Sequence, residues 1–400
     1  MFSKASKNYP ILPKLGHQLA CIVPAVLLIM PVVVEVQQTF FSTCWNRRRA
    51  NNQATFNREL VRLMRATIAR RPWTAVLSLL AVAILAYMVF AVWPEWLKAL
   101  MGRKKVFVNT LLNGLTLAAL YFLVASGFTL VFGLMRNVNL AHGSMYLLGA
   151  YIGYEAAELS GNWFVGVVVA FFVLAAVGAL MQFLVFRHMQ GDDMRQTLVS
   201  IGISIVAADL MLAAWSGTTY QFSPPDWLFG ATQLPIISAI RSSGQAVMLK
   251  YPTYRLVVLL VAVVVGLLLW LFLNRTRIGM MIRAGVDDRD MLDATGVNVQ
   301  LLFALVFAIG AGLAGFAGVI GGTALSIAPG EDVRYLLASL VVVIVGGMGS
   351  IAGAAIGALI VGMAEQFGLA YFPTYGVVVT FIIMIVVLAV RPQGLMGRAQ

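Results

Sequence analysis

Long apolar runs constrain the fold of this chain more than any other feature of its sequence. Leu256–Leu273 and Trp73–Trp93 are each close to the length of about 20 residues with which a helix crosses the hydrocarbon of a bilayer. Hydrophobic residues make up 60% of the 400 residues and charged residues only 11%, whereas about a quarter of the residues in soluble domains are charged. So few charges cannot cover the surface of a soluble fold. The sequence therefore predicts a polytopic helical membrane protein.

From residue 106 onward, apolar segments follow one another almost without interruption. They predict an all-α fold, because a segment inside the bilayer must satisfy its backbone hydrogen bonds internally. With one or two further helices upstream, we expect about 8–10 transmembrane segments, some of them discontinuous. The predicted spans lie near residues 106–133, 138–154, 163–186, 197–215, 254–273, 300–322, 336–368, which is expected to be broken, and 376–390.

Residues 1–105 differ in composition from the rest, and we expect them to form an N-terminal extension to a domain that covers residues 106–400. The apolar stretch Leu19–Val34 fits a cleaved signal peptide, a short spanning helix or an interfacial helix. Residues 46–72 combine eight arginines with apolar residues at helical spacing. This pattern fits an amphipathic helix on anionic membrane lipid or a solvated linker. Trp73–Trp93 then predicts one membrane helix.

The formal net charge of +12 does not indicate a nucleic-acid partner, because Lys and Arg are concentrated in a few segments between apolar runs. Cytoplasmic loops of membrane proteins carry such an excess. One basic loop is flanked by Arg187 and Arg195, and a second covers residues 275–289. Counting spans from these loops places residues 216–252 in the periplasm and the C-terminus in the cytoplasm. The basic residues at 98–105 do not fit this orientation, because they would lie outside.

Two cysteines and three histidines are too widely spaced to indicate a disulfide framework or a metal site, and no cofactor is expected. Two polar or glycine-rich interruptions of the apolar pattern are more informative. A broken membrane helix is tolerated only inside protein or beside a water-filled path, and transporters place such breaks near the substrate. The interruptions therefore supply candidates for a translocation path, although each also fits an ordinary turn: Asn139, His142, Gly347, Gly349 and Ser350.

Two acidic residues lie within predicted spans, and we add them to the candidate path. Charged groups in membrane helices are costly and usually face the protein interior or a cavity. Asp209 could contact the ammonium group of a zwitterionic substrate, or pair with an arginine or an amide in the bundle. Glu365 lies near the end of its span. For His142, a structural hydrogen bond is the alternative to a functional role.

Four motifs in order resemble the LivH-like permeases of branched-chain amino acid ABC importers. The first is an Asn-Gly opening, here Asn113-Gly114, followed by a glycine-rich stretch at 127–133 and by Asn-Leu-Ala-His-Gly at 139–143. Three later segments agree with the family: Arg277–Arg283 with the loop after it, Gly-Gly-Met-Gly-Ser-Ile-Ala-Gly at 346–353, and Arg-Pro-Gln-Gly-Leu-Met-Gly at 391–397. Asn113 joins the candidate path on this basis.

Some positions depart from the family pattern. Ser144 stands where the family often has Glu, and Ala338 stands where it often has Lys. The first hundred residues have no counterpart in the family pattern. The departures weaken any assignment of the substrate but not of the subunit type.

The resemblance implies a permease in the inner membrane of a bacterium, fed by a periplasmic substrate-binding protein and paired with a second permease subunit and two cytosolic ATPase subunits. The chain carries no phosphate-binding loop, so ATP hydrolysis is expected on the partners, and the chain is not expected to be an enzyme. Branched-chain amino acids are the expected substrates. Urea, short amides and aromatic acids remain open, and a secondary transporter or a membrane-anchored scaffold are the alternatives from other classes.

The loop 274–300 is expected to form the contact with the ATPase. Its pattern predicts a short amphipathic helix near residues 288–295 that ends at Gly296, a C-cap residue. By resemblance this is the coupling helix that docks in a groove of the ATPase. Its expected coupling residues are Arg283, Asp287, Asp288, Arg289, Asp290 and Gly296.

Overall fold

The computed structural model describes residues 104–135, 138–189, 191–240, 246–287, 289–371, 373, 376–391 and 393–397. The predicted extension at residues 1–105 lies outside them, apart from the first turn of helix α4, and stays a prediction. The described helices are α4 (Lys104–Met135), α5 (His142–Ser160), α6 (Trp163–Leu184), α7 (Asp193–Trp215), α8 (Thr253–Arg275), α9 (Arg277–Asp287), α10 (Arg289–Ala294), α11 (Val299–Ala324), α12 (Glu331–Gly346), α13 (Ile351–Tyr371) and α14 (Gly376–Val390), with short 3₁₀ helices at Phe186–Met189 and Asp226–Leu228.

The predicted polytopic helical fold is confirmed. Among the described residues, six helices are long and apolar enough to cross a membrane: α4, α6, α7, α8, α11 and α13. Each of the eight spans predicted downstream of residue 106 corresponds to a helix within a few residues, and the span at 336–368 is broken between α12 and α13 as expected.

A β-hairpin was not predicted. Strands β1 (Ala231–Ile240) and β2 (Ala246–Pro252) pair antiparallel within the segment interpreted as a loop. Pro235 argues against a strand, because proline cannot donate to the ladder. The register shifts between Leu234 and Ile237, so an irregularity accommodates the proline and the pairing resumes beyond it.

Helix α11 lies at the centre of the bundle and packs closely against α4, α5 and α6. Glycines make this possible. A Cβ added to Gly149 of α5 would overlap the backbone of Gly315 in α11, and one added to Gly127 of α4 would overlap the carbonyl of Gly310. Such small residues let the backbones of membrane helices approach and increase their van der Waals contact. Gly310 and Gly315 of α11 are therefore packing positions.

Helices α6, α7 and α8 leave large apolar faces exposed. Phe172 of α6, Leu210 of α7 and Val263 of α8 are each 65–68% exposed. In water, exposed patches of this size are unusual, whereas in a bilayer they meet lipid tails or another apolar helix. The exposure pattern therefore fits a membrane-embedded chain.

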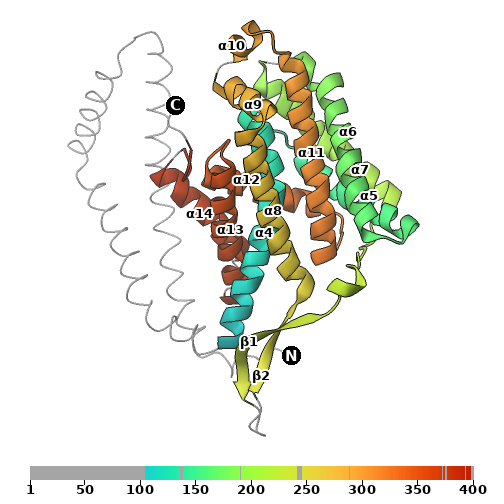
Figure 1. The fold of residues 1–400 in the computed structure, drawn as a ribbon, viewed down its shortest axis with the longest axis vertical. Coiled ribbons are helices and arrows are strands. Elements are labelled where there is room, and N and C mark those ends of the chain that lie inside the picture. Colours follow the sequence, from blue (N-terminus) through green and yellow to red (C-terminus); the bar gives the residue numbers. More distant parts are fainter. Residues whose placement is uncertain are drawn as a thin grey trace, which may run out of the picture. The chain divides into compact units, whose positions relative to one another are not determined.

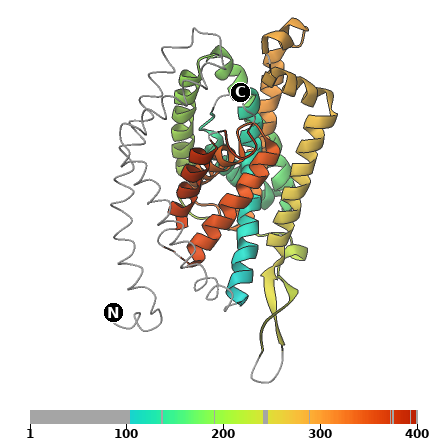
Figure 2. The same ribbon diagram turned by 90° about the vertical axis from the view of Figure 1, so that its left-hand side faces the viewer.

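The two basic loops and the β-hairpin lie at opposite ends of the bundle (Figures 1 and 2). Both basic loops lie at one end, where Phe186, Leu292 and Leu302 share an apolar cluster with the last turn of α4. The C-terminal segment reaches the same end, because the N–H of Leu395 donates to the carbonyl of Val345 at 2.9 Å. We call this the basic end. The hairpin lies at the opposite end.

The close contact between α5 and α11 predicts a sharp difference between two glycines. Gly149→Ala should lower the melting temperature of the purified protein, since overpacking a tight core contact costs about 1–3 kcal/mol. Gly202→Ala in α7 is the matched control, because a Cβ there would meet no atom within 4 Å. Thermal unfolding in detergent measures both. Equal melting temperatures for the two variants would contradict the close packing.

Candidate functional site

The first interruption, between α4 and α5, lies inside the protein. The Oδ1 atom of Asn139 accepts a hydrogen bond from the N–H of Ala141 at 3.1 Å, and the N–H of Leu140 donates to Ser200 Oγ of α7 at 3.1 Å. Asn139 is buried. The backbone groups that the break leaves unpaired are thus partly satisfied by side chains, as a membrane interior requires.

His142, the first residue of α5, joins this break to α4 through a hydrogen bond. Its Nε2 atom lies 3.0 Å from the carbonyl of Val124 and donates to it, because a carbonyl can only accept. Its ring packs edge-on against Phe128 at 5.5 Å, and the residue is 1% exposed. With its ring enclosed and anchored, His142 has a structural role in this conformation, which is the alternative that the sequence left open.

Helix α5 begins beside the middle of α4 and α7 and not beside their ends. Ser144 Oγ lies 2.8 Å from Ser204 Oγ in the middle of α7. A Cβ on Gly143 would overlap the carbonyl of Asp332 in the first turn of α12. The N-termini of α5 and α12 therefore meet inside the bundle.

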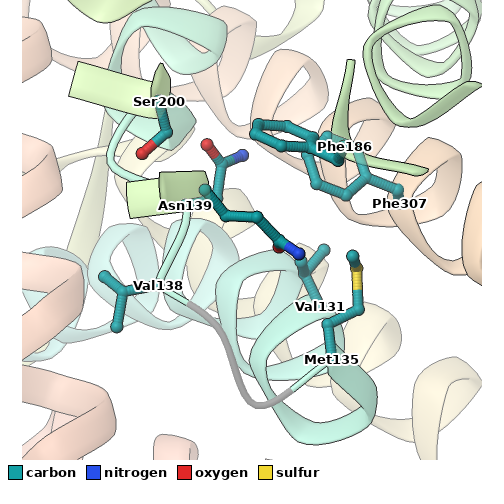
Figure 3. A pocket seen from close by; sticks show the side chains of 8 residues that line it. Val131, Met135, Val138, Asn139, Phe186, Ser200 and Phe307 are labelled. Atoms are coloured by element: carbon teal, nitrogen blue, oxygen red, sulfur yellow. The ribbon is translucent and has the colours of Figure 1, made fainter. Parts of the chain in front are cut away.

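A small cavity lies beside the first break (Figure 3). Its volume of about 10 Å³ has room for about one water molecule. The Nδ2 atom of Asn139 is buried and has no hydrogen-bond partner among the described residues. The cavity is far too small for an amino acid, so in this conformation it fits an ordered water and not a substrate. It is lined by Val131, Met135, Val138, Asn139, Phe186, Gln196, Ser200 and Phe307.

The second interruption, between α12 and α13, is a turn at the basic end. Gly347 has a φ angle of 107° and Gly349 one of 81°, which favour glycine. A Cβ on Gly347 would overlap the backbone of Gly397, and the N–H of Met396 donates to the carbonyl of Gly346 at 2.9 Å. Ser350 Oγ caps α13 by accepting from the N–H of Gly353 at 3.0 Å. The glycines are therefore needed for the turn and for the C-terminal segment packed on it.

Asn113 holds the β-hairpin and α8 against α4. Its Oδ1 atom accepts hydrogen bonds from Tyr251 Oη at 3.1 Å and from Arg255 Nη1 at 2.8 Å. Thr116, one turn further along α4, lies 3.0 Å from the same tyrosine hydroxyl. These contacts give Asn113 a structural role near the hairpin end of the bundle.

Glu365 is buried and belongs to a charged cluster that the sequence did not reveal. Its carboxylate accepts a hydrogen bond from Tyr121 Oη of α4 at 2.6 Å, and it lies 3.5 Å from the guanidinium of Arg334 in α12. Arg334 also lies 3.4 Å from Glu331. The predicted span began at residue 336, so Arg334 was taken to precede the helix, whereas α12 begins at Glu331.

Asp209 lies on the exposed face of α7. No ion pair joins it to another of the described residues, so the arginine partner suggested from the sequence is not among them. A carboxylate in a membrane helix is costly unless it faces protein or water. The place of Asp209 in a translocation path stays a prediction.

Helices α9 and α10 form the expected short element at the basic end. Ile282 and Leu292 are buried, and a Cβ on Gly285 would contact both Leu292 and Leu134 of α4. Arg283 is exposed and donates from Nη1 to Asn274 Oδ1 at 2.9 Å, across the turn between α8 and α9.

The predicted helix at 288–295 corresponds to α10, Arg289–Ala294, and Gly296 follows with a φ angle of 84°, as a C-cap glycine requires. Asp288 lies outside the described residues. Asp287, Arg289 and Asp290 are described by their backbone alone, which places all three at the junction of α9 and α10.

The structure does not gather the predicted path residues at one point. Asn139 and His142 lie at the start of α5, the glycine turn lies at the basic end, and Asn113 lies toward the hairpin. Glu365 alone joins a charged cluster. Sequence reasoning missed its partners Tyr121 and Arg334, and an arginine just before an apolar run was the signal that could have found the cluster.

Comparison with known proteins decides the family. Residues 110–388 match the sequence profile of the family described as the branched-chain amino acid transport system permease component. The chain belongs to this permease family. The LivH-like resemblance is confirmed, and the permease is a transport subunit, as its relatives are, and not an enzyme.

Its curated relatives cover most of the described part of the permease. The high-affinity branched-chain amino acid transport system permease protein BraD of Pseudomonas aeruginosa is 31% identical over 309 residues, which covers 74% of this chain and 97% of BraD. LivH of Escherichia coli is 31% identical over 310 residues, covering 74% of this chain and 96% of LivH. LivM of the same organism is 26% identical over 298 residues, covering 70% and 68%.

Asn113 offers a test of the contacts at the hairpin end. Asn113→Leu should speed hydrogen exchange in the backbone of residues 246–252, because burying unpaired donors costs about 1–3 kcal/mol. Thr232→Val is the control, since it removes only an exposed hydrogen bond to Thr253 of 3.0 Å. Mass spectrometry of the exchanged protein measures both variants. Unchanged exchange in Asn113→Leu would show that Asn113 does not hold the hairpin.

Proposed function

We propose that this chain is the permease subunit through which a bacterial ABC importer moves branched-chain amino acids, or a related small polar solute, across the inner membrane. Its membership of the permease family carries the proposal. The relatives named above transport branched-chain amino acids, and the match extends over nearly their whole length. Urea, short amides and aromatic acids are the alternative substrates.

We further propose the partners that such an importer needs. A second permease subunit completes the membrane domain, two cytosolic ATPase subunits supply energy, and a periplasmic binding protein delivers the solute. The separate LivH and LivM relatives support a paired permease. The exposed apolar faces of α6, α7 and α8 leave room for both a partner helix and membrane lipid.

The basic end of the bundle faces the cytoplasm in this proposal. Arg187, Arg195, Arg275, Arg283 and Arg391 belong to segments at this end, and basic residues favour the cytoplasmic side. Lys104 and Lys105, at the start of α4, lie toward the hairpin and do not follow this rule. The C-terminus is then cytoplasmic, and the hairpin faces the periplasm.

The ATPase subunits dock on α9 and α10. The apolar side of this element packs on α4 through Ile282 and Leu292, while Met280 and Arg283 are exposed. Because α9 and α10 pack on the long helix α4, they can transmit a movement of the ATPases to the rest of the bundle. This supports a coupling role for the residues predicted from the sequence.

Reconstitution tests the function directly. The permease, purified with its partner subunits and placed in proteoliposomes, should accumulate radiolabelled leucine only when ATP and the binding protein are present. Parallel assays with urea, a short amide and phenylalanine distinguish the alternative substrates. ATP-independent uptake driven by an ion gradient would favour a secondary transporter and would overturn the proposal.

Asp290→Arg tests docking within the same preparation. Reversing this charge on α10 should reduce co-purification of the ATPases and leucine uptake by at least about ten-fold, because an interface is sensitive to the charges that it places opposite one another. Glu158→Arg at the exposed end of α5 makes the same charge change far from α10 and should leave both unchanged. Wild-type uptake by Asp290→Arg would remove the docking role.

Cysteine labelling in intact cells tests the orientation. Met194→Cys, at an exposed position of the first basic loop, should react only with membrane-permeant reagents. Phe229→Cys, near the hairpin, should also react with impermeant reagents. Met194 lies at the start of α7 and Phe229 in the loop beyond its other end, and each is 76% exposed. Impermeant labelling at residue 194 would reverse the proposed orientation.

A further inference from the structure

Arg334 is the accessible member of the buried charged cluster. Its side chain is 44% exposed, whereas the side chain of Glu365 is 7% exposed. The distances from its guanidinium to Glu365 and Glu331, 3.5 and 3.4 Å, exceed the about 2.7–2.9 Å of a close charge-assisted hydrogen bond. A guanidinium carries five N–H donors. Arg334 therefore keeps donors that an incoming acceptor could reach.

The cluster lies deep in the membrane-spanning part. Tyr121 lies at the middle of the span Val106–Met135, and its hydrogen bond of 2.6 Å brings Glu365 to the same depth. The ion pair then fixes Arg334 there as well. A charged side chain near the bilayer centre costs at least about 2.5–3.5 kcal/mol in contact with lipid. The exposed side of Arg334 is therefore expected to face water or another polypeptide.

Apolar side chains and the half-buried carboxylate of Glu331 surround Arg334 on this face. Val333 is 54% exposed and Leu337 is 44% exposed, so both share the open side of α12 with Arg334. The ring of Tyr335 lies 6.0 Å from the guanidinium carbon of Arg334 and packs against the ring of Tyr146 of α5, with the ring centroids 4.2 Å apart. Apolar side chains beside one accessible cation and two carboxylates, of which Glu365 is the buried one, resemble the lining expected of a ligand site.

These features match the chemistry of a free amino acid. We propose that Arg334 and Glu365 line the translocation route and recognise the charged ends of a zwitterionic α-amino acid. Arg334 binds its carboxylate, the loose ion pair opens, and Glu365, held by Tyr121, faces its ammonium group. The apolar side chain then lies along Val333 and Leu337. The inference rests on the proposed function and narrows it, because urea and neutral amides carry neither charge.

Thiol accessibility tests whether this face is wet. In a protein in which Cys21 and Cys44 are replaced by Ser, Val333→Cys should react with a charged, water-soluble thiol reagent. Val263→Cys, on the apolar face of α8, is the matched control, since Val263 is 68% exposed. We expect modification at 333 to be at least about ten-fold faster, because only the thiolate reacts and an apolar setting suppresses it. Equal rates of modification at residues 333 and 263 would overturn the proposal that this face of α12 borders a solvated route.

Substrate protection tests recognition without the binding protein. In the assembled complex, saturating leucine should slow modification of Val333→Cys, whereas 4-methylpentanamide, which keeps the side chain but neither charge, should not. Adding Arg334→Gln should abolish the protection by leucine. Protection by the neutral amide to the same degree would overturn the recognition of a zwitterion.

Transport kinetics separate recognition from a merely structural ion pair. Arg334→Gln and Glu365→Gln should each lower leucine uptake by about ten-fold or more, since each removes a charge-assisted contact, and Arg334→Lys should restore part of it. Glu158→Gln is the control for loss of a carboxylate.

Co-purification of the ATPases with each variant shows that it assembles. Near-normal uptake by both glutamine variants would overturn the role of Arg334 and Glu365 in recognition but would leave the proposed function standing. Failure of the wild-type complex to transport any amino acid would instead overturn the proposed function. If a glutamine variant does not assemble, the protection experiment in the otherwise wild-type complex still decides.

Discussion

The interior of a bilayer offers no hydrogen-bond partner to an unpaired backbone group and no solvation to a lone charge. This cost explains why the polar groups of the permease are gathered between helices. Tyr121, Glu365 and Arg334 come from three different helices, and together they bring a carboxylate and a guanidinium to mid-span depth. Each charge is stabilised by the other, but the guanidinium keeps an open side. The cluster therefore joins three helices and also presents an accessible charge.

The same cost governs both helix breaks. At the start of α5, the donors that helix geometry leaves unpaired meet Asn139, Ser200 and the protein interior. At the turn between α12 and α13, the chain's own C-terminal segment pairs with the freed carbonyls of Val345 and Gly346. One break is thus enclosed within the bundle and the other is closed at its basic end. The two breaks therefore lie apart in this conformation, and their place in a translocation path stays a prediction.

The sequence predicted where helices begin and end far better than which way they face. Apolar runs and glycine breaks are visible residue by residue, so the spans, the break before α13 and the cap at Gly296 could be found. Facing direction could not, because membrane helices that are apolar on all sides lack the contrast that marks a buried face in a soluble protein.

Asp209 became a path candidate because charged groups in membrane helices usually face protein or a cavity, and in the structure it lies on the exposed face of α7. Glu365 and its hydrogen-bond partner Tyr121 are more than 200 positions apart along the chain. No local sequence pattern encodes such a contact. His142 belongs to a motif that is visible in the sequence and carries the family resemblance. Its ring nevertheless makes a structural hydrogen bond to α4, which the motif did not reveal.

In the proposed importer, the charged face of α12 borders a solvated route. An electron cryo-microscopy structure of the complex in lipid nanodiscs, with amino acid present, tests this most directly. We expect ordered water or substrate against Arg334, and acyl-chain density against Val263. Continuous acyl-chain density over Arg334, with its guanidinium still paired to Glu365, would contradict it.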